Sequence, residues 1–249
     1  MSQSESYTAG AKLDDIRALD AIAAAAANAI HQYRPRTCYP HRACVLEGQT
    51  TIAKRINSFG SNHVRRLRAR HRDPDLKCLR STQVSRTRLA TSYEQMRATW
   101  FHQEFMPGFE DVGEFRVYIV ARPAPGGLRG LAGRVVRTAK TTVQADGAIR
   151  CADVTRSDLR ACRPLTITHL RTFALYYYDE LRKREDWEGR FESLEVGIRL
   201  DITVSPGPST YRFFVNEPTR ILVADYFPGT WSGDSINEPV AAAMHRYLQ

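Results

Sequence analysis

The sequence predicts an α+β protein with a largely antiparallel sheet. Strand-like segments fill much of the first half of the chain, one long amphipathic helix follows at 163–186, and a further pair of strands comes after it. The chain has 249 residues, 43% of them hydrophobic and 25% charged. This composition is sufficient to bury a core, as one large domain or as two small lobes.

The first hundred residues alternate between expected helices and short expected strands. Residues 12–33 predict an alanine-rich helix with one apolar stripe, made of Leu13, Ile16, Leu19, Ile22 and Ala26. Two prolines in YRPRTCYPHR then end it. Short strands are expected at 43–48 and 50–56, a polar loop at 57–62 and a helix at 64–73.

The rest of the chain predicts strands around one long helix. Strands are expected at 99–108, 113–123 and 128–143, and the second of these alternates apolar and polar residues with a period of two. In the long helix, one face carries Leu170, Phe173, Ala174, Tyr177 and Leu181. A hairpin of strands at 196–205 and 211–217 follows. A last helix at 236–248 is expected to begin with the capping box Ser235-x-x-Glu238.

Positive charge is concentrated in one segment. The chain holds 36 Lys and Arg against 27 Asp and Glu, and residues 34–100 alone hold 15 basic against 4 acidic residues. Such a segment attracts polyanions, namely nucleotide phosphates, nucleic acid or an acidic membrane surface, and the alternative is a solvated basic face. Few aromatic residues lie between the basic ones at 54–90, which argues against a stacking platform for nucleic acid.

The cysteines and the beginning of the chain indicate a compartment. Five cysteines without a CxxC pair disfavour a disulfide framework or a zinc site. No apolar run approaches the roughly 18 residues that a bilayer requires. The alanine-rich run at 21–29 is interpreted as helix rather than as a signal peptide. We therefore expect a reducing, cytoplasmic location and no membrane partner.

The hairpin at 196–217 carries charged residues where a buried pair of strands should be apolar. Arg199, Asp201 and Glu217 are expected on one face, with Asp201 opposite Val215, and Asn216 is expected to point away unless the strand ends or bulges there. Two carboxylates at this separation repel each other unless a cation lies between them, and Mg²⁺ (magnesium) commonly binds one or two carboxylates plus phosphates. The alternative is a structural network of salt bridges on an exposed face.

Three segments occur in the order typical of one known superfamily. IAKRINSFGSNHV, WFHQEFMPGFEDVGEFRVYIV and GIRLDITVS…YRFFVNEPTR together resemble ATP-grasp enzymes of the carboxylate–amine ligase type, and look especially like uncharacterised fungal ATP-grasp proteins. The resemblance covers about residues 50–230. It implies two lobes with largely antiparallel sheets that clasp a nucleotide cleft. The implied division is an N-terminal helical remnant at 1–45, a lid lobe at 46–100 and a C-terminal lobe with a metal-binding hairpin at 101–249.

The resemblance also assigns roles to individual residues. The implied contacts to ATP phosphates are Lys54 and the loop residues Ser58, Gly60 and Ser61. The segment that would line the adenine is Gln103, Glu104, Phe105 and Met106, and Glu110 is the second candidate, beside Glu104, for the ribose contact. Without the resemblance, Lys54 reads as an ordinary surface lysine.

Phosphoryl transfer and metal binding are implied for the GEFRV segment and the hairpin. The implied catalytic arginines are Arg116 and Arg199, and the implied magnesium ligands are Asp201, Glu217 and Asn216. Asn216 is included because the asparagine that the resemblance implies at position 219 is replaced by Thr219. The alternative reading of Arg116 is a cross-strand partner for Glu114 or a neighbour.

These residues predict an ATP- and Mg²⁺-dependent ligase that activates an acid substrate as an acylphosphate, which an amine or thiol then attacks. A kinase on the same scaffold would use the same nucleotide site. Two other readings stay open: a degenerate ATP-binding pseudoenzyme, and a basic protein that binds polyanions or nucleic acid through 34–100. Only about 45 residues precede the first lid strand, so the front domain is expected to be reduced, replaced by a partner protein or lost from a truncated gene product.

Overall fold

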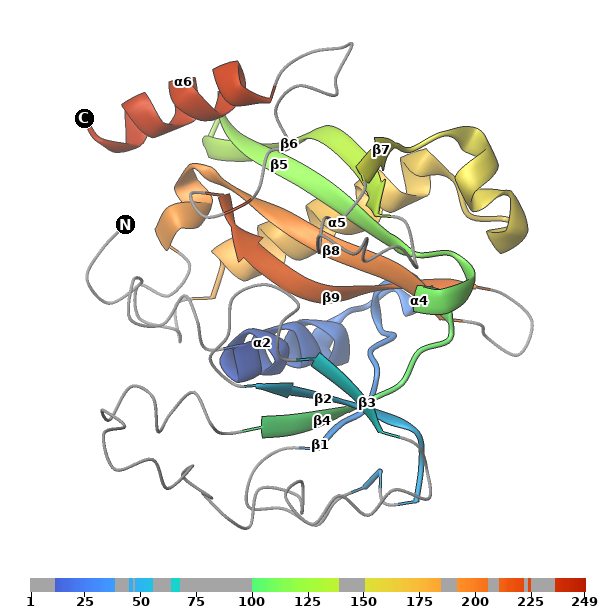
Figure 1. Cartoon of the computed structure of the whole chain (residues 1–249). Coiled ribbons are helices and arrows are strands. Elements are labelled where there is room, and N and C mark those ends of the chain that lie inside the picture. The colour runs from blue at the N-terminus through green and yellow to red at the C-terminus, as the bar shows by residue number, and fades with distance from the viewer. Residues whose placement is uncertain are drawn as a thin grey trace, which may run out of the picture.

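The computed structural model describes residues 12–38, 45–46, 48–55, 64–67, 100–138, 151–184, 192–205, 211–221, 224 and 236–249. These residues form two antiparallel sheets, one of four strands and one of five, together with helices (Figure 1). The predicted α+β class with antiparallel sheets is therefore confirmed. Among the helices of these segments, none combines the length and the apolarity that crossing a membrane requires.

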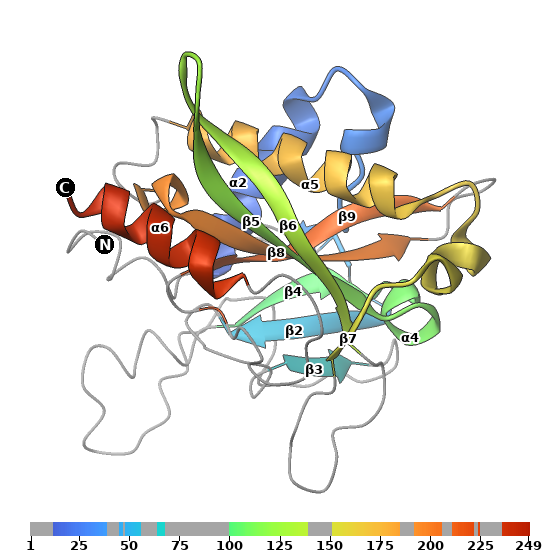
Figure 2. The same cartoon turned by 90° about the horizontal axis from the view of Figure 1, so that it is seen from above.

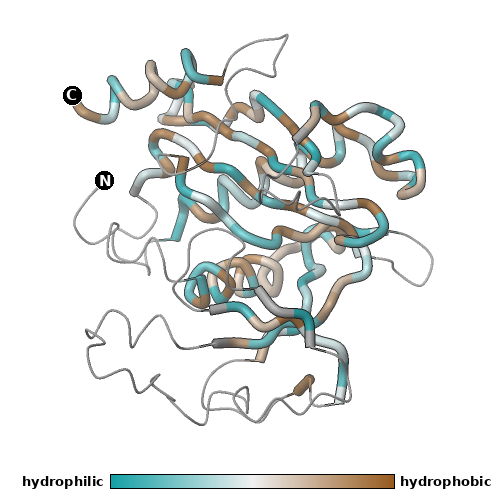
Figure 3. The backbone as a smooth tube through the Cα atoms, in the orientation of Figure 1, coloured by the Kyte–Doolittle hydropathy of each residue, from teal (hydrophilic) through white to brown (hydrophobic). Residues whose placement is uncertain are grey.

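The larger sheet has the strand order β7-β6-β5-β8-β9. Its strands are β5 (Glu114–Ala124), β6 (Gly127–Thr138), β7 (Cys151–Asp153), β8 (Gly197–Ser205) and β9 (Arg212–Arg220). Hydrophilic and hydrophobic residues alternate along this sheet (Figure 3), because its two faces have different surroundings. Strand β8 is buried along its whole length, including its charged residues Arg199 and Asp201.

Two helices cover opposite faces of the larger sheet (Figure 2). Helix α5 (Ile167–Arg182) buries the five residues predicted for its inner face, together with Phe115, Val117 and Ile119 of β5. Its side-chain cap is Thr166, whose Oγ1 accepts a hydrogen bond from the backbone N–H of His169. On the other face, α6 (Asn237–Tyr247) packs in a second cluster with Tyr118 and Val120.

The smaller sheet has the strand order β1-β4-β2-β3 and lies below the larger sheet in the view of Figure 1. Its strands are β1 (Thr37–Cys38), β2 (Thr51–Arg55), β3 (Val64–Leu67) and β4 (Trp100–Glu104). Strand β1 lies before the predicted lid lobe at 46–100, and β4 begins at its last residue. The division of the chain into lobes at 1–45, 46–100 and 101–249 stays a prediction. Short helical segments connect the larger elements: η1 (Ala29–His31), α4 (Gly108–Asp111), η4 (Arg156–Cys162) and η6 (Glu192–Glu195).

Helix α2 (Lys12–Ala25) contacts both β9 and α5. Four residues of its predicted apolar stripe join the main core, namely Leu13, Ile16, Leu19 and Ile22. The helix ends at Ala25 rather than near residue 33, so Ala26 is buried but lies outside both the helix and this core. One polar pair fixes it to the sheet, because both guanidinium Nη atoms of Arg220 donate to the carboxylate of Asp15, at 3.0 and 3.1 Å. The two side chains are only 1% and 4% exposed, so this pair is part of the interior.

Three local predictions from the sequence are wrong or incomplete. Residues 45–46 form a turn instead of a strand, closed by a hydrogen bond from the N–H of Gln49 to the carbonyl of Leu46 and by Gly48 at φ +76°. Within the expected helix at 64–73, residues 64–67 form strand β3 instead, because pairing with β2 overrides local propensity, and 68–73 lie outside the described residues. Helix α6 begins after Ile236 without a side-chain cap, and Ser235 of the predicted capping box lies outside the described residues.

Candidate functional site

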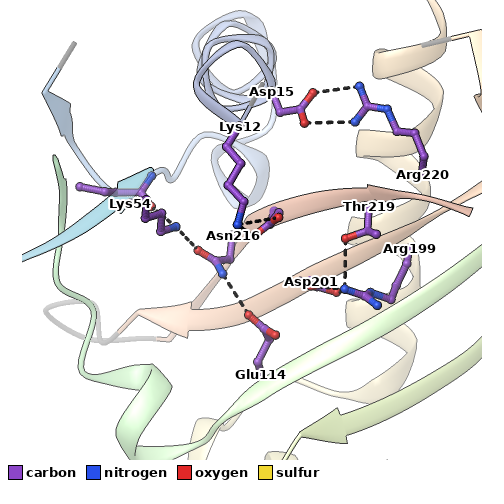
Figure 4. Close-up of polar contacts among 11 residues, drawn as sticks. Lys12, Asp15, Lys54, Glu114, Arg199, Asp201, Asn216, Thr219 and Arg220 are labelled. Atoms are coloured by element: carbon purple, nitrogen blue, oxygen red, sulfur yellow. Dashed lines mark hydrogen bonds and ion pairs between the residues drawn. The ribbon is translucent and has the colours of Figure 1, made fainter. Parts of the chain in front are cut away.

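Three adjacent strands place polar residues on the face of the larger sheet opposite α5. Asp201 of β8 pairs with Arg116 of β5 on one side and with Glu217 of β9 on the other, so all three side chains leave the same face. Residues from α2 and β2 reach this face as well (Figure 4). We call the whole set the polar cluster: Lys12, Lys54, Glu114, Arg116, Arg199, Asp201, Asn216, Glu217 and Thr219.

A β-bulge in β9 brings an extra residue into the polar cluster. Ile202 pairs with Val215 but Asp201 pairs with Glu217, so Asn216 has no partner residue on β8. The expected pairing of Asp201 with Val215 is therefore wrong, because the sequence gives no sign of the bulge. The bulge re-aims the amide of Asn216 into the cluster, where its oxygen accepts from Lys54 and its nitrogen donates to Glu114.

Lys54 connects the two sheets. Its ammonium donates to Gln103 Oε1 at 2.8 Å and to Asn216 Oδ1 at 2.7 Å. The amide of Gln103 in turn donates to Thr37 Oγ1 at 3.2 Å, so three strands of the smaller sheet support this contact. Burial lowers the pKa of Lys54 to about 8, although the nearby charge of Glu217 acts in the opposite direction. The reading of Lys54 as an ordinary surface lysine is wrong, because its side chain is buried.

Glu114 is a site residue that the sequence analysis treated only as a neighbour of Arg116. Its Oε2 accepts a hydrogen bond from Asn216 at 3.0 Å, and its Oε1 lies 3.9 Å from Arg116 Nε. Burial and the charge of Asp201 raise the pKa of Glu114 to about 7. Arg116 and Glu114 are thus partners, as one reading of Arg116 expected. The contact is not cross-strand, because both residues lie on β5, two positions apart.

Arg199 and Asp201 form a buried bidentate ion pair. Arg199 Nε donates to Asp201 Oδ1 at 2.7 Å and Nη2 donates to Oδ2 at 2.9 Å. The Nη2 group also donates to Thr219 Oγ1 at 3.1 Å. Although burial disfavours the charged guanidinium, the charge and hydrogen bonds of Asp201 raise the pKa of Arg199 above its usual value. Thr219, which stands where an asparagine was expected, therefore holds Arg199.

The N-terminal helix adds a cation that the sequence analysis did not foresee. Lys12 Nζ lies 3.2 Å from each carboxylate oxygen of Glu217. Its side chain is only 8% exposed, whereas that of Glu217 is 31% exposed. Only the spacing in the sequence could have indicated this contact. Lys12 and Asp15 are three residues apart, so they lie on the same face of α2, which is the face toward β9.

The segment expected to line the adenine divides into two groups. Gln103 belongs to the contacts of the polar cluster through Lys54. The other residues contact groups outside the polar cluster. Glu104 pairs with Arg36, Phe105 lies under the guanidinium of Arg66 at 4.0 Å, Met106 accepts a hydrogen bond from Tyr33, and Glu110 pairs with Arg66. Their roles toward a nucleotide stay predictions, as do those of Ser58, Gly60 and Ser61, which lie outside the described residues.

The polar cluster has more positive than negative groups, and its carboxylates are already paired with cations of the chain. Both oxygens of Asp201 accept from Arg199, and both oxygens of Glu217 lie at Lys12. Within the segments that the structure describes, no three His, Cys, Asp or Glu side chains gather as a metal site. A resident Mg²⁺ therefore does not fit this arrangement of Asp201, Glu217 and Asn216 unless ion pairs of the chain are exchanged. Four cations against three acids favour an anionic ligand.

Comparisons with known proteins give a similarity in fold and none in sequence family. No family model matches the sequence, and no curated protein matches it. The solved structure of D-cycloserine synthetase DcsG, an ATP-grasp ligase, aligns over 98% of this chain and 72% of its own, with a TM-score of 0.51 and 12% sequence identity. The resemblance to fungal ATP-grasp proteins finds no support in these comparisons. The fold of the chain is ATP-grasp-like.

Proposed function

We propose that the protein is an ATP-dependent ligase of the ATP-grasp type, which binds the triphosphate of ATP at the polar cluster. The observation that carries this proposal is Lys54, a buried ammonium that joins both sheets of an ATP-grasp-like fold at a cluster with excess positive charge. Burial makes such an ammonium costly unless strong acceptors surround it, and phosphate oxygens are strong acceptors. The ligand we infer is therefore a nucleotide, with its adenine along Gln103–Met106 and its ribose at Glu104 or Glu110.

The proposed reaction has two steps. A carboxylate oxygen of the acid substrate attacks the γ-phosphorus of ATP, the bond to the bridging oxygen breaks, and ADP leaves with the electron pair. An amine or thiol then attacks the carbonyl carbon of the acylphosphate, and inorganic phosphate leaves. Arg116 and Arg199 are the proposed stabilisers of charge on the transferred phosphoryl group, because phosphoryl transfer depends mainly on positioning and charge neutralisation.

Magnesium belongs to the proposal as the counter-ion of the nucleotide. Asp201, Asn216 and Glu217 stay the candidate ligands, and each of them must give up a partner within the chain before it binds a metal. This requirement is the specific observation in favour of the second candidate function, a pseudoenzyme that binds ATP without turnover. The polyanion hypothesis for 34–100 stays a prediction, since 68–99 lie outside the described residues.

Trapping of the acylphosphate tests the proposed function. The purified protein is incubated with ATP, Mg²⁺, hydroxylamine and pools of carboxylic acids, because hydroxylamine converts an acylphosphate into a stable hydroxamate. We expect ADP and hydroxamate to form only with a suitable acid, and both to be lost in Lys54→Met. ADP that forms with an acceptor but without hydroxamate would indicate a kinase. ATP binding without ADP formation under any pool would favour the pseudoenzyme.

A further inference from the structure

The contact between Lys12 and Glu217 is a symmetric ion pair. The ammonium lies at the same distance, 3.2 Å, from both carboxylate oxygens, so it occupies the side of the carboxylate from which a divalent cation would have to bind both oxygens. Within the described residues, Glu217 is the one hydrogen-bond partner of Lys12. Since the Lys12 side chain is only 8% exposed, loss of Glu217 would leave a largely desolvated ammonium without its acceptor from the chain.

Helix α2 is held so that Lys12 stays at this position. One turn further along the helix, Asp15 forms the buried bidentate pair with Arg220 of β9, three residues after Glu217. Leu13 and Ile16 fix the same turn in the main core. The ammonium is thus positioned by the fold and not by a flexible surface contact (Figure 4).

The carboxylate of Asp201 has a cation partner, Arg199, that also has a second acceptor. Arg199 bonds Thr219 as well as Asp201, so its guanidinium keeps a partner if Asp201 turns toward a metal. Lys12 has no second partner of this kind among the described residues, so the release of Glu217 would leave a buried ammonium without an acceptor. The two carboxylates are therefore unequal as metal ligands.

We propose that Lys12 is the permanent counter-ion of Glu217 and takes the place of a metal ion there, which makes helix α2 part of the active site. This inference rests on the proposed function and removes Glu217 from the three candidate magnesium ligands named there, which leaves Asp201 and Asn216. The site then takes one divalent cation with the nucleotide, on the side of Asp201. The N-terminal helix, expected only as a remnant, supplies a positioning residue for the triphosphate end of the ligand.

Manganese binding tests this role without relying on turnover. Bound Mn²⁺ is counted per chain by electron paramagnetic resonance, with a non-hydrolysable ATP analogue at saturation. We expect one Mn²⁺ in the wild type and in Glu217→Gln, with similar affinity, and a loss of at least about tenfold in affinity in Asp201→Asn. Lys12→Gln, which leaves the Glu217 carboxylate without its cation, is expected to bind a second Mn²⁺ and to gain in melting temperature when Mn²⁺ is added.

The controls separate this role from a structural one. Arg17→Gln removes an exposed cation of the same helix and should bind one Mn²⁺ like the wild type. If Lys12→Gln does not fold, Glu217→Gln alone decides the question, because a loss of Mn²⁺ affinity in that variant would overturn the proposal. Two Mn²⁺ in the wild type would also overturn it, while leaving the proposed function standing. If neither the analogue nor Mn²⁺ binds the wild type, the proposed function itself fails.

Discussion

The buried pair between Asp15 and Arg220 gives the most demanding prediction of stability. The substitution Arg220→Met leaves a carboxylate that is 4% exposed without its bidentate partner. Removing one partner of a buried ion pair costs about 3–5 kcal/mol, because the remaining charge stays desolvated. For a chain of this size about 1 kcal/mol changes the melting temperature by roughly 2–4 °C, so we expect a decrease of roughly 6–20 °C.

A double-mutant cycle by urea unfolding checks this reasoning. Replacing both partners, in Asp15→Leu with Arg220→Met, is expected to recover most of the loss, because an apolar pair carries no desolvated charge. The matched control is the surface pair of the same helix, Asp14 and Arg17, whose side chains are 38% and 46% exposed. Removing that pair should cost about 0.3–0.5 kcal/mol. If Arg220→Met costs no more than the surface pair, the account of how α2 is held is wrong.

Three further predictions address the nucleotide, the pH dependence and the packing of the core. Lys54→Met is expected to weaken ATP binding by at least about tenfold, or ~1.4 kcal/mol, by calorimetry, whereas Lys183→Met at the exposed C-terminal end of α5 should not change it. The pKa of Glu114 is raised from 4.5 to about 7, so its contribution to stability is present below about pH 4.5 and is lost as the pH rises through 7. In Glu114→Gln, the free energy of unfolding measured with urea should therefore depend less on pH between about pH 5 and 8 than in the wild type. An unchanged pH dependence would refute the raised pKa of Glu114. A Cβ at Gly108 would lie 1.7 Å from the carbonyl oxygen of Val204, so Gly108→Ala should lose about 1–3 kcal/mol or more, while Gly133→Ala, with nothing within 4 Å, should be tolerated. Equal unfolding midpoints for the two glycine variants would contradict the packing described here.

Strands and helices with a clear period could be predicted from the sequence. Strand β5 alternates apolar and polar residues, and its apolar face indeed packs with α5. The same pattern predicted that Arg199 and Asp201 share a face, because that relation depends only on spacing along one strand. Strand β3 was missed because its residues have no such period, and its partner β2 determines its conformation.

Contacts that depend on tertiary structure could not be predicted in this way. The bulge at Asn216 changes the register of β9 by one residue, and no local pattern marks it. The pairing of Lys12 with Glu217 joins residues 205 positions apart, so only the docking of α2 on β9 brings them together. Glu114 became a site residue for the same reason, since its partner Asn216 lies 102 positions away.

We propose that the polar cluster binds ATP together with a divalent cation. Thermal unfolding of the wild type and of Asp201→Asn, with ATP alone, Mg²⁺ alone and both, tests it most directly, because a ligand that binds the native state raises the melting temperature. We expect the wild type to be stabilised most by ATP and Mg²⁺ together and this increment to be absent in Asp201→Asn. An unchanged melting temperature with all of these additions would show that the polar cluster does not bind ATP.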